Sequence, residues 1–281
     1  MQDRRNDKLH FGKLFLYAVL ILMAAALVIY LICGGFNTSE DSSELSDHDI
    51  VYEKINLGFS EHQSTIRFLS ACGINEVGDI YSEVLADHPE YFWDKGAHIK
   101  LFRLPFVSAS FINTEYLCDP AVLPAMERRM NSAVDIIVQK ANEYDTDKDK
   151  ALFVHDYLVS NCAYDEAGYH SGYPKSLSYT CYGCIVNQCA VCQGYAEAYQ
   201  LILNRLGIEC GLIPGTAVYE SETSSHAWNY VRLDGEYYMV DVTWDDPLEY
   251  SGPIRHDYFC LSEEKMGVDH FPEDGWQLPN S

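Results

Sequence analysis

One cysteine in the second half of the chain stands where a thiol could be activated as a nucleophile. Cys192 lies near the start of AVCQGYAEAYQLILNRL (residues 190–206), in which apolar residues recur at helical spacing before Gly207, a typical helix stop. The first turn of a helix offers unpaired backbone N–H groups and the positive end of the helix dipole, and both favour a thiolate over a thiol. Taken alone, the position is also typical of an inert core cysteine.

A predicted hairpin downstream supplies a base and a carboxylate. Residues 226–233 (HAWNYVRL) and 236–243 (EYYMVDVT) alternate like strands on either side of Asp-Gly, a typical two-residue hairpin turn. In that register His226 and Asp241 are diagonal neighbours on one face, with about 7–8 Å between their backbones, and Thr243 lies opposite His226. A loop one residue longer would turn one strand over and separate them.

Together these residues fit the requirements of a catalytic triad. A cysteine nucleophile needs a base that takes its proton, and the base needs a third group that fixes its tautomer. If Asp241 accepts a hydrogen bond from one ring nitrogen of His226, the other nitrogen can face Cys192. Individually His226 could be a core histidine and Asp241 a capping carboxylate where the strand ends. The three in this order favour the triad.

The elements that must position these residues form an α+β pattern. Helices are predicted over residues 125–144 and 148–159, ahead of the nucleophile helix. The upstream residues mix helix-like runs at 64–69 and 79–86 with a strand or hairpin at 98–109. We therefore expect an N-terminal α+β portion followed by a catalytic core.

The acidic run before the second of these helices does not indicate a calcium site. Asp145, Asp147 and Asp149 resemble the start of a calcium loop, but Lys150 replaces the turn glycine and Asp156 replaces the glutamate at position twelve. These acids are better interpreted as capping a helix N-terminus.

The N-terminal residues predict a membrane anchor. Residues 14–33 form an uncharged run of 20 residues, long enough as a helix to cross the hydrocarbon core. Basic residues precede it, so the N-terminus should be cytoplasmic and the remainder extracytoplasmic. A cleaved signal peptide is the alternative. The predicted order is cytoplasmic 1–13, transmembrane 14–33, flexible stalk 34–49, N-terminal α+β portion 50–145 and catalytic core 146–281.

The charge of the chain excludes one class of partner. The formal net charge is −23 at pH 7, and a body this acidic repels phosphate backbones, so nucleic acid is not an expected partner. The composition, 48% hydrophobic and 13% aromatic, indicates a globular fold with ample material for a core.

The chain has ten cysteines, which is many for a cytosolic enzyme. Cys181, Cys184, Cys189 and Cys192 form C-x2-C-x4-C-x2-C, which matches neither a zinc ribbon nor a ferredoxin run, and a metal on Cys192 would consume the nucleophile. Disulfides or a redox role for the other thiols stay open at this point. We expect no metal and no other cofactor.

The motifs VCQGYAEAYQLILNRLGIEC, SHAWNYVRLDGEYYMVDVTWDDP and HDYFCLSEEKMGVDH resemble the bacterial transglutaminase-like superfamily over about residues 147–270. The resemblance implies a papain-like α+β fold, with a nucleophile helix packed on an antiparallel sheet. It also implies Cys192 as nucleophile, His226 as base and Asp241 as the orienting acid. For the oxyanion, the backbone N–H of Cys192 is the assigned donor, with Tyr182 and Gln188 as weaker candidates.

These observations predict acyl chemistry on protein or cell-wall peptide amides through a thioester. Release to water gives a peptidase or deamidase, and release to an amine gives a cross-linking transglutaminase; the triad does not decide between them. One alternative is a non-catalytic peptide-binding module on the same fold, and another is a redox or metal protein that uses the cysteine cluster. The sequence leaves the oligomeric state open.

Overall fold

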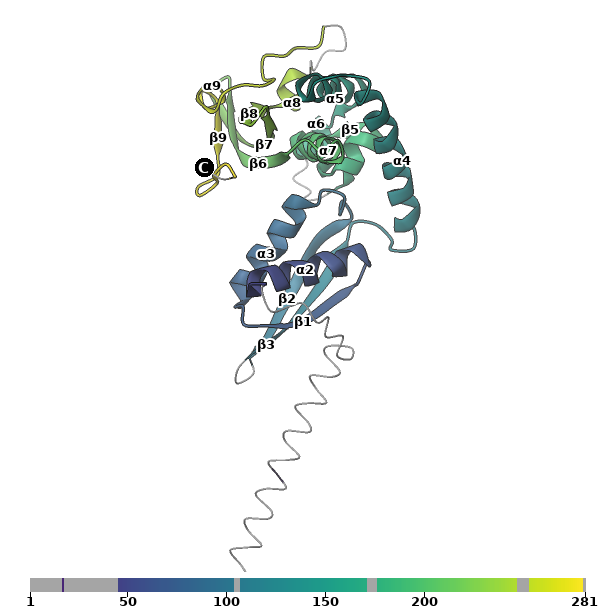
Figure 1. Ribbon diagram of the computed structural model, residues 1–281, viewed down its shortest axis with the longest axis vertical. Coiled ribbons are helices and arrows are strands. Elements are labelled where there is room, and N and C mark those ends of the chain that lie inside the picture. Colours follow the sequence, from purple (N-terminus) through teal and green to yellow (C-terminus); the bar gives the residue numbers. More distant parts are fainter. Residues whose placement is uncertain (1–16, 18–44, 104–106, 171–175, 247–252, 280–281) are drawn as a thin grey trace, which may run out of the picture. The chain divides into compact units, whose positions relative to one another are not determined.

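The computed structural model describes residues 17, 45–103, 107–170, 176–246 and 253–279 (Figure 1). They divide into two compact units. The first takes the described residues up to Tyr81 together with Ala97–Thr114, and the second takes Ser82–Gly96 and Glu115–Ser281. No helix among the described residues is long and apolar enough to span a membrane. The predicted anchor at residues 14–33 lies, except for Tyr17, outside these residues.

The first unit is a small three-stranded sheet with a helix packed on it. Strand order is β1-β3-β2, and β1 runs antiparallel to β3. The elements are α2 (Asp47–Ser60), β1 (Thr65–Ser70), α3 (Ile74–Asp87), β2 (Asp94–Arg103) and β3 (Ser108–Tyr116); α3, β2 and β3 each extend into the second unit.

Two local predictions in this region were wrong. The helix predicted at residues 64–69 is instead strand β1 (residues 65–70), along which burial alternates, with Ile66 and Phe68 inside and Arg67 outside. The segment assigned as flexible stalk also ends earlier than predicted. Helix α2 already begins at Asp47, where Ser46 and Asp49 form a reciprocal capping box.

Other helices agree with the sequence reading. The run at 79–86 lies within α3, and α4 (Leu123–Ala141) and α5 (Asp147–Asn161) match the predicted pair. Thr146 accepts a hydrogen bond from the backbone N–H of Asp149, so the acids there do lie in the first turn of a helix.

The second unit combines helices with a four-stranded antiparallel sheet of order β8-β7-β6-β9. Its strands are β6 (Cys210–Tyr219), β7 (Glu222–Leu233), β8 (Glu236–Val240) and β9 (His270–Pro272), and a short parallel pair is β4 (Ala163–Tyr164) with β5 (Cys189–Ala190). Its remaining helical segments are α6 (Glu166–His170), η1 (Leu177–Tyr179), η2 (Gly183–Asn187), α7 (Cys192–Arg205), α8 (Val242–Asp245) and α9 (Glu263–Met266). Helix α7 packs against β6 and β7 (Figure 1).

The predicted hairpin register is confirmed, but the second strand is shorter than predicted. Leu233 pairs with Glu236 around a two-residue turn, in which Asp234 and Gly235 both have positive φ angles. Strand β8 ends at Val240 and helix α8 follows, so Thr243 does not lie opposite His226. The strand stops there because the Asp241 side chain caps the new helix.

Candidate active site

Cys192 is the first residue of α7, as the sequence predicted, and is only 6% exposed. The preceding Val191 is extended and offers no side-chain cap, so the first-turn N–H groups of the helix are not consumed by a capping side chain. Gly194 allows residues 178–180 to approach the helix closely: a Cβ at this position would lie 2.6 Å from the carbonyl oxygen of Ser178. The helix start is therefore held against the chain that precedes it.

His226 and Asp241 meet inside the second unit. His226 lies on β7, and its Nε2 is 2.6 Å from Oδ2 of Asp241, within the hydrogen-bonding distance predicted from the hairpin. The other carboxylate oxygen, Oδ1, accepts from the backbone N–H groups of Thr243 at 2.9 Å and Trp244 at 3.3 Å. Asp241 thus caps helix α8 and also contacts His226, so the two interpretations of this residue from the sequence are both correct.

The Cys192 side chain lies close enough to His226 to act on its ionisation. Burial disfavours the imidazolium, but the negative charge of Asp241 and the hydrogen bond to it, together with the influence of Cys192, outweigh burial and raise the pKa of His226. Burial opposes ionisation of Asp241 too, yet the charge and hydrogen bond of His226, joined by those of His270, hold the pKa of Asp241 well below its usual range. The three predicted residues are brought together, with the cation on His226 favoured.

His270 is a member of this cluster that sequence reasoning missed. Its Nε2 lies 3.0 Å from Oδ2 of Asp241, and its Nδ1 lies 2.7 Å from Oδ1 of Asp269. The ring is buried, and it is delivered by β9, which pairs with β6. The motif ending in VDH contains the residue, but no local spacing links it to Asp241. Only the strand pairing does.

Aromatic rings enclose the histidines. Trp244 lies 4.5 Å from His270 and 5.6 Å from His226 between ring centroids, and Trp228 stacks against His226 at 6.1 Å. These rings keep water from the hydrogen bonds to Asp241, which strengthens those bonds.

Two tyrosines that the sequence reading did not single out lie close enough to interact electrostatically with Cys192. The pKa values of Tyr164 and Tyr179 are raised above the ordinary value. Burial is the main cause, and the negative charge of Cys192 is the second. The hydroxyl of Tyr164 therefore stays protonated. The two weaker oxyanion candidates from the sequence have other surroundings. Tyr182 stacks on Phe92, with 4.7 Å between ring centroids, and Gln188 is exposed in a left-handed backbone conformation.

The four cysteines of C-x2-C-x4-C-x2-C differ in their surroundings. Cys181 is buried and donates to the carbonyl of Pro89 at 3.0 Å, Cys184 interacts with Cys162, and Cys189 is exposed. The nine cysteines among the described residues are free thiols, and no group of possible metal ligands found there includes a cysteine. Burial raises the pKa of Cys181, Cys184 and Cys189, which keeps them as thiols.

A cavity of about 210 Å³ runs along one face of α7. Gln193, Glu197 and Gln200 line it from the helix, and Tyr179 and Thr180 line it from η1 and the residue after it. The residue next to Cys192 in sequence therefore faces the cavity, while the thiol itself is not among its lining residues. The cavity lies beside the cluster of Cys192, His226 and Asp241 rather than within it.

Parts of the chain are similar to known proteins and structures. Residues 135–242, which include Cys192, His226 and Asp241, match the model of the transglutaminase-like superfamily. Mouse (Mus musculus) kyphoscoliosis peptidase is 25% identical over 207 residues, covering 68% of this chain and 30% of that protein. Human (Homo sapiens) kyphoscoliosis peptidase is 30% identical over 102 residues, covering 31% and 15%. The matches thus span less than a third of these relatives. A crystal structure of a TGase is 14% identical with a TM-score of 0.38, covering 69% of this chain and 55% of that one.

Proposed function

We propose, on the premise that this chain carries a transglutaminase-like domain, that it is an enzyme whose Cys192 performs acyl transfer or hydrolysis on protein or peptide amides. In this proposal Cys192 is the nucleophile, His226 the acid and base, and Asp241 the residue that orients His226. The observation that carries it is the 2.6 Å contact between His226 Nε2 and Asp241 Oδ2, in a histidine whose ionisation Cys192 also influences. A peptide-binding module would not need this arrangement.

The proposed reaction follows from these contacts. With Nε2 bonded to Asp241, Nδ1 of His226 is the nitrogen available to Cys192, and it holds the proton of the thiol as a thiolate–imidazolium pair. The thiolate attacks the amide carbonyl carbon. The carbon–nitrogen bond then breaks as His226 gives its proton to the leaving amine, and a thioester remains on Cys192. Water or a second amine, deprotonated by His226, attacks the thioester and releases the thiolate.

The negative oxygen formed in each attack needs hydrogen-bond donors. The backbone N–H of Cys192, at the start of α7, is one donor. We assign the hydroxyl of Tyr164 as the second, since Tyr164 pairs with Ala190, two residues before Cys192, and influences the same site electrostatically. A tyrosine that ionised near neutral pH would instead repel the oxyanion.

The choice between water and an amine as acceptor belongs to the surroundings of the thioester, not to the triad. Both outcomes, a peptidase or deamidase and a cross-linking transglutaminase, are compatible with the same three residues. Protein or cell-wall peptides are the proposed substrates.

We also propose that residues 14–33 anchor the chain in a membrane with the catalytic domain outside. Removal of this domain by protease added to intact cells tests the placement, and a soluble form beginning near residue 34 would contradict the anchor.

Alkylation of the full-length protein by iodoacetamide at mildly acidic pH, mapped by mass spectrometry, tests the nucleophile. Cys192 is expected to react fastest although it is buried, because the proposed base, His226, takes its proton. Cys189 is the matched control. It is exposed, but partial desolvation and the charge of Asp165 raise the pKa of its thiol. Fast reaction at Cys189 with an inert Cys192 would overturn the assignment. With glutamine-containing peptides, a thioester adduct on Cys192, absent in Cys192→Ser, is the second expected result, and products formed with and without an added primary amine then decide the acceptor.

A further inference from the structure

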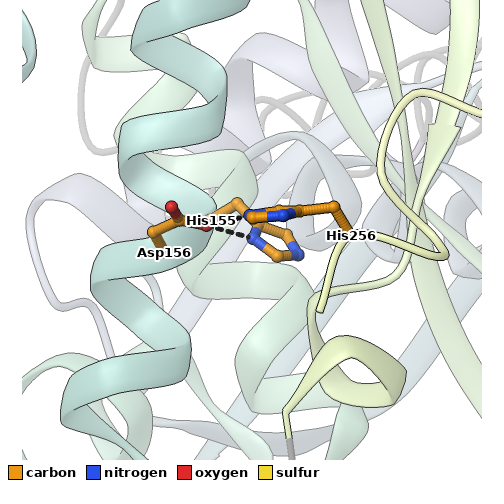
Figure 2. A group of neighbouring side chains, drawn as sticks. All are labelled: His155, Asp156 and His256. Carbon is orange, nitrogen blue, oxygen red and sulfur yellow. Dashed lines mark hydrogen bonds and ion pairs between the residues drawn. The ribbon is translucent and has the colours of Figure 1, made fainter. Parts of the chain in front are cut away.

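A second histidine–carboxylate cluster lies at the opposite end of α8 from Asp241. His155 and Asp156 are neighbours on α5, and His256 lies in the segment that leads toward α9. One oxygen of Asp156, Oδ1, is 2.9 Å from Nδ1 of His155 and 2.8 Å from Nε2 of His256. Figure 2 shows the three side chains converging from the helix and from the facing segment. The proposed acyl chemistry uses none of them.

We propose that His155, Asp156 and His256 form a binding site for a divalent transition-metal ion of the zinc type. The ligand atoms would be Nδ1 of His155, Oδ1 of Asp156 and Nε2 of His256, and the three residues each offer a ligand atom within 4.8 Å of the other two. Nitrogen and oxygen ligands bind zinc at about 2.0–2.1 Å, so in a tetrahedral site they are about 3.3 Å apart. Each nitrogen–oxygen distance must therefore open by only about 0.4–0.5 Å, which small side-chain rotations supply.

The surroundings of His155 match those of a metal ligand. Its Nε2 lies 3.2 Å from Oδ2 of Asp245, and both side chains are fully buried. Asp245 is itself fixed, because its Oδ1 accepts from the backbone N–H groups of Asp257 at 2.9 Å and Tyr258 at 3.2 Å. A carboxylate behind one ring nitrogen fixes the tautomer and leaves the other nitrogen for the ion, which is the usual environment of a metal-bound histidine.

The donor set and its exposure decide which ion fits. Two imidazole nitrogens and one carboxylate oxygen suit zinc, cobalt or nickel, whereas calcium and magnesium take oxygen ligands. The side chains of Asp156 and His256 are 35% and 44% exposed, while that of His155 is fully buried. The site thus has a fixed inner ligand and an outer side through which an ion enters and at which water completes the coordination.

A bound ion would fasten the segment around His256 to α5. That segment also supports the proposed catalytic residues, since the carbonyl of Tyr258 accepts from the backbone N–H of Asp241 at 3.0 Å. Without an ion, the same three side chains satisfy one another by hydrogen bonds. The metal-bound and hydrogen-bonded forms are therefore two states of one cluster, and the ion stabilises the fold without taking part in the acyl chemistry.

Zinc titration of the full-length protein tests this site. The accessible thiols are first blocked with iodoacetamide so that they do not compete for the ion. The wild type is expected to bind one equivalent of Zn²⁺ by equilibrium dialysis and to melt at a higher temperature with Zn²⁺ than with EDTA. His256→Gln keeps a donor to Asp156, so its melting temperature in EDTA should stay close to wild type. Its Zn²⁺ affinity should fall at least about 10-fold, since losing even an outer-shell partner of a metal ligand has that effect.

His170→Ala is the matched control, because His170 is exposed at the end of α6 and belongs to neither histidine cluster. It should respond to Zn²⁺ like the wild type. A wild type that neither binds nor is stabilised by Zn²⁺, or a His256→Gln variant that responds equally, would show that the cluster is only a hydrogen-bonded network. Binding and melting are measured without substrate, so this result does not depend on whether the proposed acyl transfer is correct.

Discussion

The two ends of α8 carry the same pair of groups in different surroundings. Asp241 before the helix and Asp245 at its end are both buried, and each accepts from a histidine brought by another element and from backbone N–H groups. In the proposed mechanism the second nitrogen of His226 serves the thiol of Cys192, whereas that of His155 lies 2.9 Å from Asp156. A buried histidine–carboxylate pair is therefore not a catalytic device by itself. What the second ring nitrogen meets decides its role.

The largest expected difference between the two pairs is in turnover. Asp241→Asn keeps an oxygen that caps α8 but leaves His226 in the wrong tautomer, so kcat should fall by about 10⁴-fold, as in other triads. Steady-state kinetics on a glutamine-containing peptide, with circular dichroism to confirm folding, measures this. A loss smaller than about 10-fold would remove Asp241 from the proposed triad.

The corresponding change at the other end of the helix should act on stability. Asp245→Asn places an amide where Oδ1 and Oδ2 accept from Asp257, Tyr258 and His155, so one donor must face another. Breaking a buried charged pair in this way costs about 3 kcal/mol of the free energy of unfolding. Urea denaturation measures the loss. Turnover of the folded fraction should change by less than about 10-fold. If turnover collapsed while the free energy of unfolding was unchanged, Asp245 would have the same role in catalysis as Asp241.

His270 should have a smaller effect, because it acts only through Asp241. His270→Gln retains one N–H donor but cannot bridge Asp241 and Asp269 as the imidazole does. We expect kcat to fall about 10-fold, which corresponds to the lower end of a hydrogen bond to a charged group. The pH profile of Cys192 alkylation should shift as well, which a purely structural role would not cause. An unchanged profile would restrict His270 to packing.

The smallest effect is the pH dependence of stability contributed by the His226–Asp241 pair. The lowered pKa of Asp241 gives stability that is fully present above the unfolded value of about 3.9 and is lost as pH falls through the folded pKa. The raised pKa of His226 gives stability that is fully present below about 6.5 and is lost as pH rises through the folded pKa. The melting-temperature difference between wild type and Asp241→Asn should therefore be largest at about pH 4–6.5 and narrow on both sides. A difference in melting temperature that grew toward alkaline pH would contradict the raised pKa of His226.

Part of the proposed site could be read from the sequence because its signals are local. The Asp-Gly turn fixes the register of β7 against β8, and that register places Asp241, the residue after β8, near His226. Apolar spacing and the following glycine place Cys192 in the first turn of α7. Residues 135–242, which contain these motifs, match the model of the transglutaminase-like superfamily, as the motifs had indicated. Each of these inferences uses residues that are close together in the chain.

The remaining features depend on contacts between distant segments, which no local pattern encodes. His270 reaches Asp241 only because β9 pairs with β6, and His155 meets Asp245 across 90 residues of chain. Residues 65–70 become strand β1 because they pair with β3, although the same residues suggested a helix in isolation. The sequence by itself determined which groups could ionise and the local geometry of the hairpin. The tertiary structure decided which histidine faces a thiol and which faces a carboxylate, because burial and long-range pairing set the neighbours of each ring nitrogen.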